Sequence, residues 1–269
     1  MQHRPRKRFS QNFLVDRHTI GRIVDAVNPL RGERIVEIGP GRGALTRPLL
    51  ERVDQLTVIE IDRDLAGALR SEFPGEHLNV VVADALTVEL SSLGSGLRIV
   101  GNLPYHISSP LLFHCAEQVE HVTDLHFMLQ AEVVDRMAAA PGTPEYGRLS
   151  VTLQSVFSVE RLFRVSAGAF FPVPAVESAV ARLVPLGDAR PAIHDRQIFE
   201  TVVAAGFGQR RKTLRNALQK HISAGALEDL GVDPGVRAET LPVSVFVAIA
   251  NAVALAQDAS SSAAPAGWT

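Results

Sequence analysis

Four consecutive residues near the middle of the chain, Asn102-Leu103-Pro104-Tyr105, have the types needed to act on an amine attached to an aromatic ring. The lone pair of such an amine is delocalised, so it is a poor nucleophile until its N–H bonds are held. The Asn102 side-chain oxygen and the Leu103 carbonyl can both accept from it. Pro104 restricts the backbone before it, and Tyr105 can stack on a base. The pattern predicts methylation of an exocyclic amine, driven by orientation and polar stabilisation. The alternative is an Asn-capped turn with Tyr105 in the core.

A second aromatic segment, Phe170-Phe171-Pro172-Val173-Pro174, comes later in the chain. A Phe in a loop stiffened by proline could form the other face of a base sandwich. For Phe170 this interpretation and a place in the core remain equally open. For Phe171 we expect a place in the core.

A glycine-rich segment, Gly39-Pro40-Gly41-Arg42-Gly43, follows a short apolar stretch. Glycines allow a tight turn and a close approach of the backbone to a ligand. Gly39, Gly41 and Ala44 also satisfy the dinucleotide pattern G-x-G-x-x-A, so the glycines alone do not choose the cofactor.

Polar residues follow the next three apolar stretches. Glu60 suits two hydrogen bonds to ribose hydroxyls, and Asp84 can accept from an adenine amino group. With Gly39 and Asn102 they end four successive predicted strands. Because such ends share one edge of a parallel sheet, we expect these residues around one crevice.

The elements that would position these residues alternate along the chain. We expect strands at 34–38, 56–61, 78–83, 97–100 and 125–129, later strands at 157–163 and 179–184, and helices at 44–52, 65–73 and 110–117. The alternation predicts an α/β fold with a Rossmann-like, mostly parallel sheet covered on both faces.

The last part of the chain differs in character. After a linker at 189–194, residues 197–207, 209–221 and 244–257 have helical spacing. We therefore expect a catalytic domain at 1–188, a small C-terminal helical domain at 189–258 and a disordered, Ser/Ala/Pro-rich tail at 259–269.

Charge is segregated although the formal net charge is only -2. Residues 51–94 are acidic, whereas two segments are basic without any acid. One is an N-terminal arm and the other lies within 209–220. Such clusters can contact phosphates, although a solvated arm and helix face remain open. The candidate RNA-binding residues are Arg4, Arg6, Lys7, Arg8, Arg210, Arg211, Lys212 and Arg215.

Composition excludes several classes of protein. With 46% hydrophobic and 21% charged residues, the 269-residue chain is not broadly disordered. A single cysteine, Cys115, excludes internal disulfides and cysteine-rich zinc sites, and the histidines lack ligand spacing, so we expect no metal. The longest apolar stretch, 245–256, contains Asn251 and is shorter than the roughly 18–20 residues of a membrane span. Since no signal-peptide segment follows the N-terminus, we expect a cytoplasmic protein without a membrane partner.

The sequence resembles the ribosomal RNA adenine N6,N6-dimethyltransferase family over nearly its whole length, and within it the bacterial small-subunit (16S) enzymes. The matching stretches are 11–16, 37–43, 102–105, 127–130, 146–150, 170–178 and 207–216. The last of these distinguishes the small-subunit enzymes from the related macrolide-resistance methylases. His106 departs from the family pattern, which often has Asn there, and we interpret it as a turn residue rather than a base.

The resemblance implies a class I methyltransferase sheet and S-adenosyl-L-methionine as methyl donor, with S-adenosyl-L-homocysteine as product. It places Asn12 and Leu14 over the cofactor. It also makes Phe170 the residue that stacks on the target base. The implied cofactor-binding residues are Asn12, Leu14, Gly39, Gly41, Glu60, Asp84 and Asn102, and the implied catalytic residues are Asn102, Leu103, Pro104, Tyr105 and Phe170.

The implied reaction is dimethylation of two adjacent adenines in a hairpin loop near the 3′ end of small-subunit rRNA. The implied substrate is an immature 30S particle met late in assembly, and we expect a monomeric enzyme. Three alternatives remain. They are a large-subunit rRNA methylase of the macrolide-resistance type, a non-catalytic protein that binds assembling subunits, and an NAD-dependent dehydrogenase.

Overall fold

The computed structural model describes residues 12–209 and 211–262, and of residues 260–262 only the backbone. The chain forms two compact units. The first contains residues up to Asp135 together with Phe157–Pro185, and the second contains Arg136–Val156 and the residues from Leu186 onward. The sequence suggested one cut near residue 188, whereas here Arg136–Val156 also groups with the second unit.

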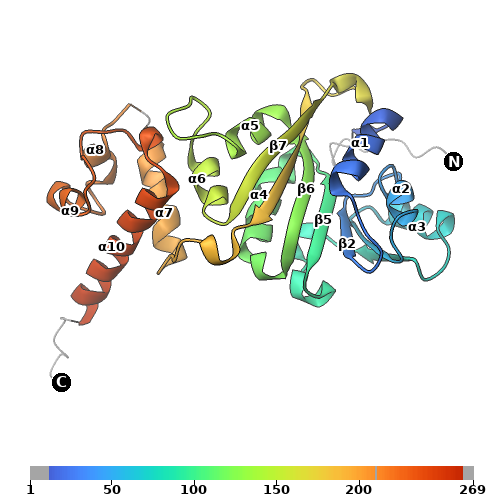
Figure 1. The fold of residues 1–269 in the computed structure, drawn as a ribbon, viewed down its shortest axis with the longest axis horizontal. Helices are drawn as coiled ribbons and strands as arrows, with labels where there is room; N and C mark the ends of the chain where they lie inside the picture. Colours follow the sequence, from blue (N-terminus) through green and yellow to red (C-terminus); the bar gives the residue numbers. More distant parts are fainter. Residues whose placement is uncertain (1–11, 210, 263–269) are drawn as a thin grey trace. The chain divides into compact units, whose positions relative to one another are not determined.

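A seven-stranded sheet forms the centre of the first unit (Figure 1). Its order is β4-β3-β2-β5-β6-β9-β7. The first five are parallel, and β9 runs antiparallel to both β6 and β7. The strands are β2 (Arg34–Ile38), β3 (Leu56–Glu60), β4 (Leu78–Val82), β5 (Leu97–Asn102), β6 (Val122–Gln130), β7 (Phe157–Val165) and β9 (Ser178–Pro185).

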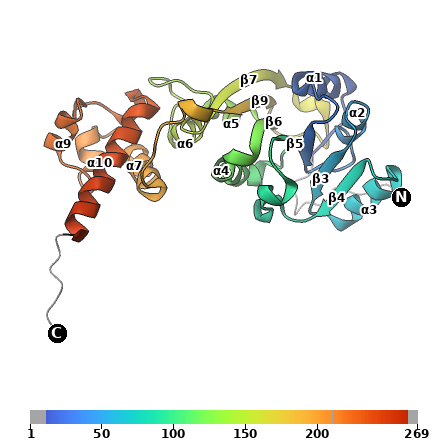
Figure 2. The ribbon, with the colours of Figure 1, turned by 60° about the horizontal axis from the view of Figure 1, so that its bottom comes forward.

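Helices cover both faces of this sheet (Figure 2). Three of them, α1 (Arg17–Val27), α2 (Thr46–Leu50) and α3 (Arg63–Glu72), share one buried cluster with apolar residues of the strands. On the opposite face lies α4 (Ser108–Glu117), which buries Leu111, Leu112 and Cys115. The expected α/β architecture, with its mostly parallel sheet, is therefore confirmed.

A two-stranded ribbon, β1 (Phe13–Leu14) with β8 (Phe170–Phe171), joins residues that are far apart in the sequence. The strands are antiparallel, with Phe13 opposite Phe171 and Leu14 opposite Phe170. Directly after β1, the Asp16 side chain accepts a hydrogen bond from the backbone N–H of Thr19 at 2.8 Å and so caps α1. The ribbon and this cap fix the start of the described chain.

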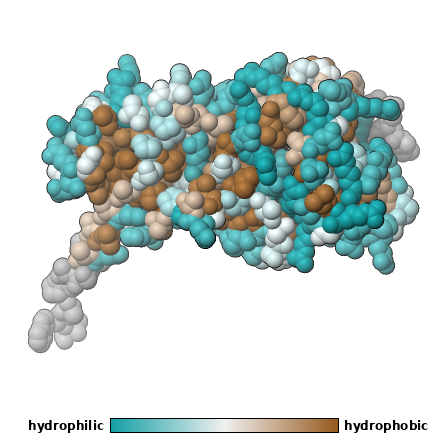
Figure 3. Space-filling model, viewed as in Figure 1, coloured by the Kyte–Doolittle hydropathy of each residue, from teal (hydrophilic) through white to brown (hydrophobic). Residues whose placement is uncertain are grey.

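The second unit is helical. Its core contains Phe199 and Phe246, and the hydroxyl of Tyr146 donates to the Leu241 carbonyl at 2.9 Å. Apolar residues also reach its surface on the face in Figure 3 (brown, left). Its helices are α6 (Arg148–Gln154), α7 (Arg196–Gly208), α8 (Leu214–Leu218), α9 (Ala224–Asp229) and α10 (Val243–Ser262), and α5 (Ala131–Met137) spans the boundary between the units.

Short 3-10 helices complete the described chain. They are η2 (Ala85–Thr87), η3 (Leu90–Leu93), η4 (Tyr105–Ile107), η5 (Val119–His121), η6 (Ala167–Ala169), η7 (Gly187–Ala189) and η8 (Ala238–Thr240). Within residues 12–209 and 211–262, no helix is long and apolar enough to cross a membrane.

Two predictions about the C-terminal part were wrong in detail. The single helix expected at 209–221 is only α8, because Thr213 adopts an extended backbone (φ -67°, ψ 159°) and the helix begins after it. Residues 259–262 were assigned to a disordered tail, but α10 continues through Ser262. The rest of that tail lies outside the described residues.

Candidate functional site

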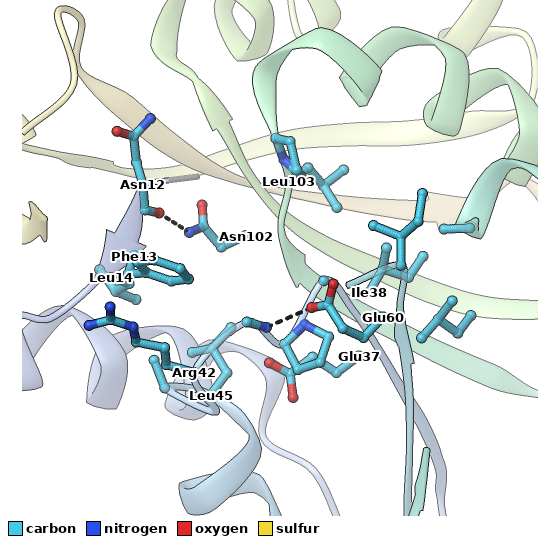
Figure 4. Close-up of a pocket in the computed structure, with 18 of the residues that line it drawn as sticks. Asn12, Phe13, Leu14, Glu37, Ile38, Arg42, Leu45, Glu60, Asn102 and Leu103 are labelled. Carbon is cyan, nitrogen blue, oxygen red and sulfur yellow. Dashed lines mark hydrogen bonds between the residues drawn. The ribbon is translucent and has the colours of Figure 1, made fainter. Parts of the chain in front are cut away.

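A cavity of about 740 Å³ lies at the carboxyl ends of the parallel strands in the first unit (Figure 4). Its volume is within the roughly 300–1,000 Å³ typical of small-molecule and cofactor sites. Residues from the ends of β2, β3 and β5, from the segment after β4 and from the β1–β8 ribbon line it together. They include Asn12, Phe13, Leu14, Glu37, Gly39, Gly41, Glu60, Asp84, Asn102, Leu103, Pro104, Tyr105 and Phe170.

The glycine turn after β2 has a conformation that ordinary side chains rarely adopt. Gly39 and Gly41 have φ values of 67° and 56°. A Cβ at Gly41 would also come within 3.2 Å of the Phe13 ring. At the end of β5, a Cβ at Gly101 would lie 2.6 Å from the Ile38 carbonyl oxygen. Glycine thus lets two backbone segments close tightly around the cavity.

Glu60, at the end of β3, is held by backbone N–H groups. One carboxylate oxygen accepts from the Gly41 N–H at 3.1 Å (Figure 4), and the other accepts from the Asp62 N–H at 2.8 Å. Burial raises the pKa of Glu60 above its ordinary value, against these two hydrogen bonds. The carboxylate is therefore oriented at the cavity wall, and each oxygen still has a lone pair to offer.

Asp84 follows β4 and caps η2, where its side chain accepts from the Leu86 N–H at 3.0 Å. The strands β4, β3, β2 and β5 lie side by side in this order in the sheet. The four strand ends predicted to meet therefore do meet, with Gly39, Glu60, Asp84 and Asn102 around one cavity.

The tetrapeptide lies at the end of β5 and continues into η4. The Asn102 amide nitrogen donates to the Asn12 carbonyl at 3.2 Å (Figure 4), and the backbone N–H of Leu103 donates to the Met128 carbonyl at 3.1 Å. The Tyr105 hydroxyl lies 3.1 Å from the Ser178 hydroxyl, at hydrogen-bond distance. Tyr105 and Pro104 both line the cavity, and His106 lies beside them in η4.

The two phenylalanines of β8 have opposite environments. Phe170 is 3% exposed and lines the cavity together with Leu14. Phe171, which the sequence suggested was in the core, is 60% exposed. The prediction for Phe171 was wrong because successive residues of a strand point to opposite faces, and Phe171 points away from the face on which Phe170 is buried.

Glu37 was overlooked as a candidate on its own. It is a buried acid on β2 that lines the cavity, and one of its carboxylate oxygens accepts from the Thr46 hydroxyl at 2.6 Å. Burial raises its pKa to about 8, although the Thr46 hydrogen bond opposes the shift. An acid enclosed by the apolar residues Ile35, Val36 and Ile38 of β2 was the signal that could have found it.

Of the basic residues predicted to contact RNA, the structure describes Arg211, Lys212 and Arg215, and none of these three lines the cavity. Arg4, Arg6, Lys7, Arg8 and Arg210 lie outside the described residues. Arg211, Lys212 and Arg215 are exposed in the second unit. Arg211 and Lys212 precede α8, and Arg215 is its second residue. Cys115 is buried in α4, and burial raises its thiol pKa to about 12. No cluster of three or more His, Cys, Asp or Glu residues suited to a metal ion occurs in the part of the chain that the structure describes.

Comparisons with known proteins agree with this geometry. The profile of the family described as "Ribosomal RNA adenine dimethylase" matches residues 2–255. "Ribosomal RNA small subunit methyltransferase A" of Aromatoleum aromaticum is 53% identical over 94% of this chain and 96% of its own length. The protein of the same name from Bordetella pertussis is 53% identical over 93% of this chain and 95% of its own.

Two solved structures share the fold. A dimethyladenosine transferase from Plasmodium falciparum aligns with a TM-score of 0.77 at 22% identity, over 88% of this chain and 95% of its own. The 23S rRNA methyltransferase ErmE aligns with a TM-score of 0.68 at 30% identity, over 90% of this chain and 100% of its own. The expected methyltransferase type of sheet is thereby confirmed.

Proposed function

The chain belongs to the ribosomal RNA adenine dimethylase family, and on that premise we propose that it transfers methyl groups from S-adenosyl-L-methionine to adenine N6 in small-subunit rRNA. The substrate would be two adjacent adenines in the 3′-terminal hairpin loop of 16S rRNA, in an immature 30S particle, each dimethylated by a cytoplasmic monomer. One observation carries the proposal. Asn102, which can hold an amine, lines the same cavity as Gly39, Glu60 and Asp84, which can hold a nucleoside.

The described residues fit S-adenosyl-L-methionine. The cavity has the volume of a cofactor site, and glycines keep the turn after β2 close to it. Glu60 would hold the ribose hydroxyls and Asp84 the adenine amino group, while Asn12, Leu14 and Gly41 would cover the cofactor. When bound, S-adenosyl-L-methionine supplies an electrophilic methyl group on a positively charged sulfur and leaves as S-adenosyl-L-homocysteine.

The protein's part in the reaction is to orient the amine. With its nitrogen bonded to the Asn12 carbonyl, Asn102 has its oxygen free to accept from adenine N6, and the Leu103 carbonyl would accept the second N–H. Both bonds draw the N6 lone pair out of the ring and aim it at the methyl group. Phe170 and Tyr105 would hold the extruded base by stacking.

The experiment is transfer of labelled methyl groups to purified small subunits that lack the modification. N6,N6-dimethyladenine should accumulate at two adjacent positions of 16S rRNA. If unmethylated small subunits gain no label, the proposal fails. Large subunits serve as the second substrate. Label on 23S rRNA instead would favour the macrolide-resistance alternative, which is supported here only by 30% identity to ErmE against 53% to the small-subunit enzymes.

The remaining alternatives make different predictions. A non-catalytic assembly factor would bind particles with the cavity blocked by S-adenosyl-L-homocysteine and would give no methylated product. A dehydrogenase would bind NAD more tightly than S-adenosyl-L-methionine in calorimetry.

A further inference from the structure

The β1–β8 ribbon leaves one aromatic ring uncovered beside the cavity. Phe171 is 60% exposed, although phenylalanine is usually buried. Its partner across the ribbon is Phe13, which lines the cavity. Directly opposite residues of an antiparallel pair point to the same side. Phe171 therefore stands next to a cavity-lining ring, at the rim of the cavity.

The chain segment that contains Phe171 is apolar and uncharged. From Ala169 to Val176 the chain carries no charged residue. Val173 and Val176 are 65% and 44% exposed, and Val15, in the segment after β1, is 53% exposed. Several exposed apolar side chains on two neighbouring segments beside a ligand cavity indicate an interaction surface.

Cations on the cavity wall limit what can bind here. Arg17, an exposed residue at the start of α1, lines the cavity and makes no ion pair with any described residue. The guanidinium of Arg42, also exposed, lies 4.4 Å from the centre of the Phe13 ring. An occupant that offers flat apolar surfaces together with negative charge matches this rim. A single strand of nucleic acid has both, in its bases and its phosphates.

We propose that Phe171 stacks on the nucleobase adjacent to the target adenine, while the strand's phosphates pass by Arg17 and Arg42. This rests on the proposed function and deepens it. Phe170 and Phe171 lie on opposite faces of β8, so one base cannot occupy both rings. Phe170, inside the cavity, takes the extruded base, and Phe171, outside, takes its neighbour. The enzyme then recognises a dinucleotide rather than an isolated adenine.

The test compares Phe171→Ala, Phe171→Trp and Leu30→Ala on unmethylated small subunits. Leu30 is a matched control, because it is 58% exposed in the same unit but precedes the amino end of β2. Loss of one stacked base costs about 1–3 kcal/mol, so kcat/KM of the alanine variant should fall by about 5- to 150-fold. The tryptophan variant should keep wild-type activity, and Leu30→Ala should be unchanged.

A second measurement separates stacking from a structural effect. Small subunits are reconstituted from ligated rRNA with an abasic nucleotide next to the target adenine. On this substrate the wild type and Phe171→Ala should react equally, because neither has a base to stack. The inference would be overturned if Phe171→Ala lost the same factor in kcat/KM on the natural and the abasic small subunits. It would also be overturned if Phe171→Ala methylated natural small subunits at the wild-type rate. A dimer in sedimentation that only Phe171→Ala dissolves would assign the rim to a second copy of the chain. Failure of the wild type to methylate any small subunit would instead reject the proposed function.

Discussion

The amide nitrogen of Asn102 donates to the backbone carbonyl of Asn12, 90 residues earlier in the chain, at 3.2 Å. This bond attaches the segment before α1 to the end of β5. It also fixes the Asn102 oxygen as the atom available to accept from a substrate amine. The Asn102 side chain, which we expect to orient N6, therefore also holds the segment that contains Asn12 in place.

Asn102→Ala should therefore lose methyl transfer by about 10²–10³-fold in kcat, the range seen when one preorganised polar group is removed from an active site. The residue is only half buried, so we expect the thermal midpoint to change little. Steady-state turnover and circular dichroism check the two parts. Turnover near the wild-type rate would reject the assigned role of Asn102.

Gly101→Ala should destabilise the protein by about 1–3 kcal/mol, since its Cβ would lie 2.6 Å from the Ile38 carbonyl oxygen and force β5 from β2. Activity should fall with it, because β5 carries Asn102. Gly67→Ala is the matched control. Its Cβ meets no atom within 4 Å, and alanine favours the interior of α3 by roughly 0.5–1 kcal/mol. Urea unfolding of both variants gives the comparison, and equal stabilities would contradict it.

The parts of the site that could be predicted are those fixed by strand topology. Glu60, Asp84 and Asn102 each end an apolar stretch, and parallel strands bring such ends to one edge. The β1–β8 ribbon could not be predicted, because two-residue strands carry no periodicity and pair across more than 150 residues. For the same reason no pattern in the sequence separates the buried Phe170 from the exposed Phe171.

Local backbone conformation explains why the helix expected at 209–221 is shorter in the structure. Residues 209–221 have helical spacing throughout, but the extended backbone at Thr213 interrupts the helix there. Serine and threonine favour this conformation as helix caps. The spacing of apolar residues indicates which side chains could face a core, but it does not show where the helix begins. Here the helix begins after the capping position at Thr213.

Asp124→Asn should cost about 1.5–3 kcal/mol, the range for hydrogen bonds to a charged group, because Arg98 keeps its ion pair with Glu33 at 2.7 Å. The Asp124 carboxylate accepts two hydrogen bonds from Arg98, at 3.0 and 2.8 Å, and both side chains are largely buried. The exposed pair Arg52–Asp25 is the control, and Asp25→Asn should cost about 0–1 kcal/mol. Urea unfolding at neutral pH measures both, and a small loss in Asp124→Asn would show that water reaches Arg98.

The Asp124 carboxylate should also make the free energy of unfolding depend on pH in the acid range. Burial raises the Asp124 pKa, but the neighbouring His126 and Arg98 outweigh it and hold the pKa well below its ordinary value. A lowered pKa contributes stability above the unfolded pKa, and that stability is lost as pH falls below about 4. Asp124→Asn should remove this part of the acid sensitivity.

Neutralising Arg211, Lys212 and Arg215 together to Gln should weaken binding of small subunits and flatten its dependence on salt. Each phosphate contact contributes roughly 0.7–0.9 to the slope of log K against log salt, so the slope should fall by about two to three. Arg31→Gln, an exposed cation of the first unit, should leave the slope unchanged. Sedimentation at several salt concentrations measures it, and an unaltered slope in the triple variant would make the cluster a solvated surface.

Glu37 should give the protein a pH dependence of the opposite sign to that of Asp124. Burial raises its pKa to about 8, from 4.5 in the unfolded chain, so the folded state keeps a proton that the unfolded state has released. The stability that this provides is complete below pH 4.5 and is lost as pH rises from there to about 8, by at most about 1.4 kcal/mol per pH unit. Glu37→Gln keeps a neutral acceptor for Thr46 and cannot ionise. Its thermal midpoint, relative to the wild type, should therefore rise between pH 5 and pH 8. A constant difference across that range would mean that Glu37 is already ionised in the folded protein.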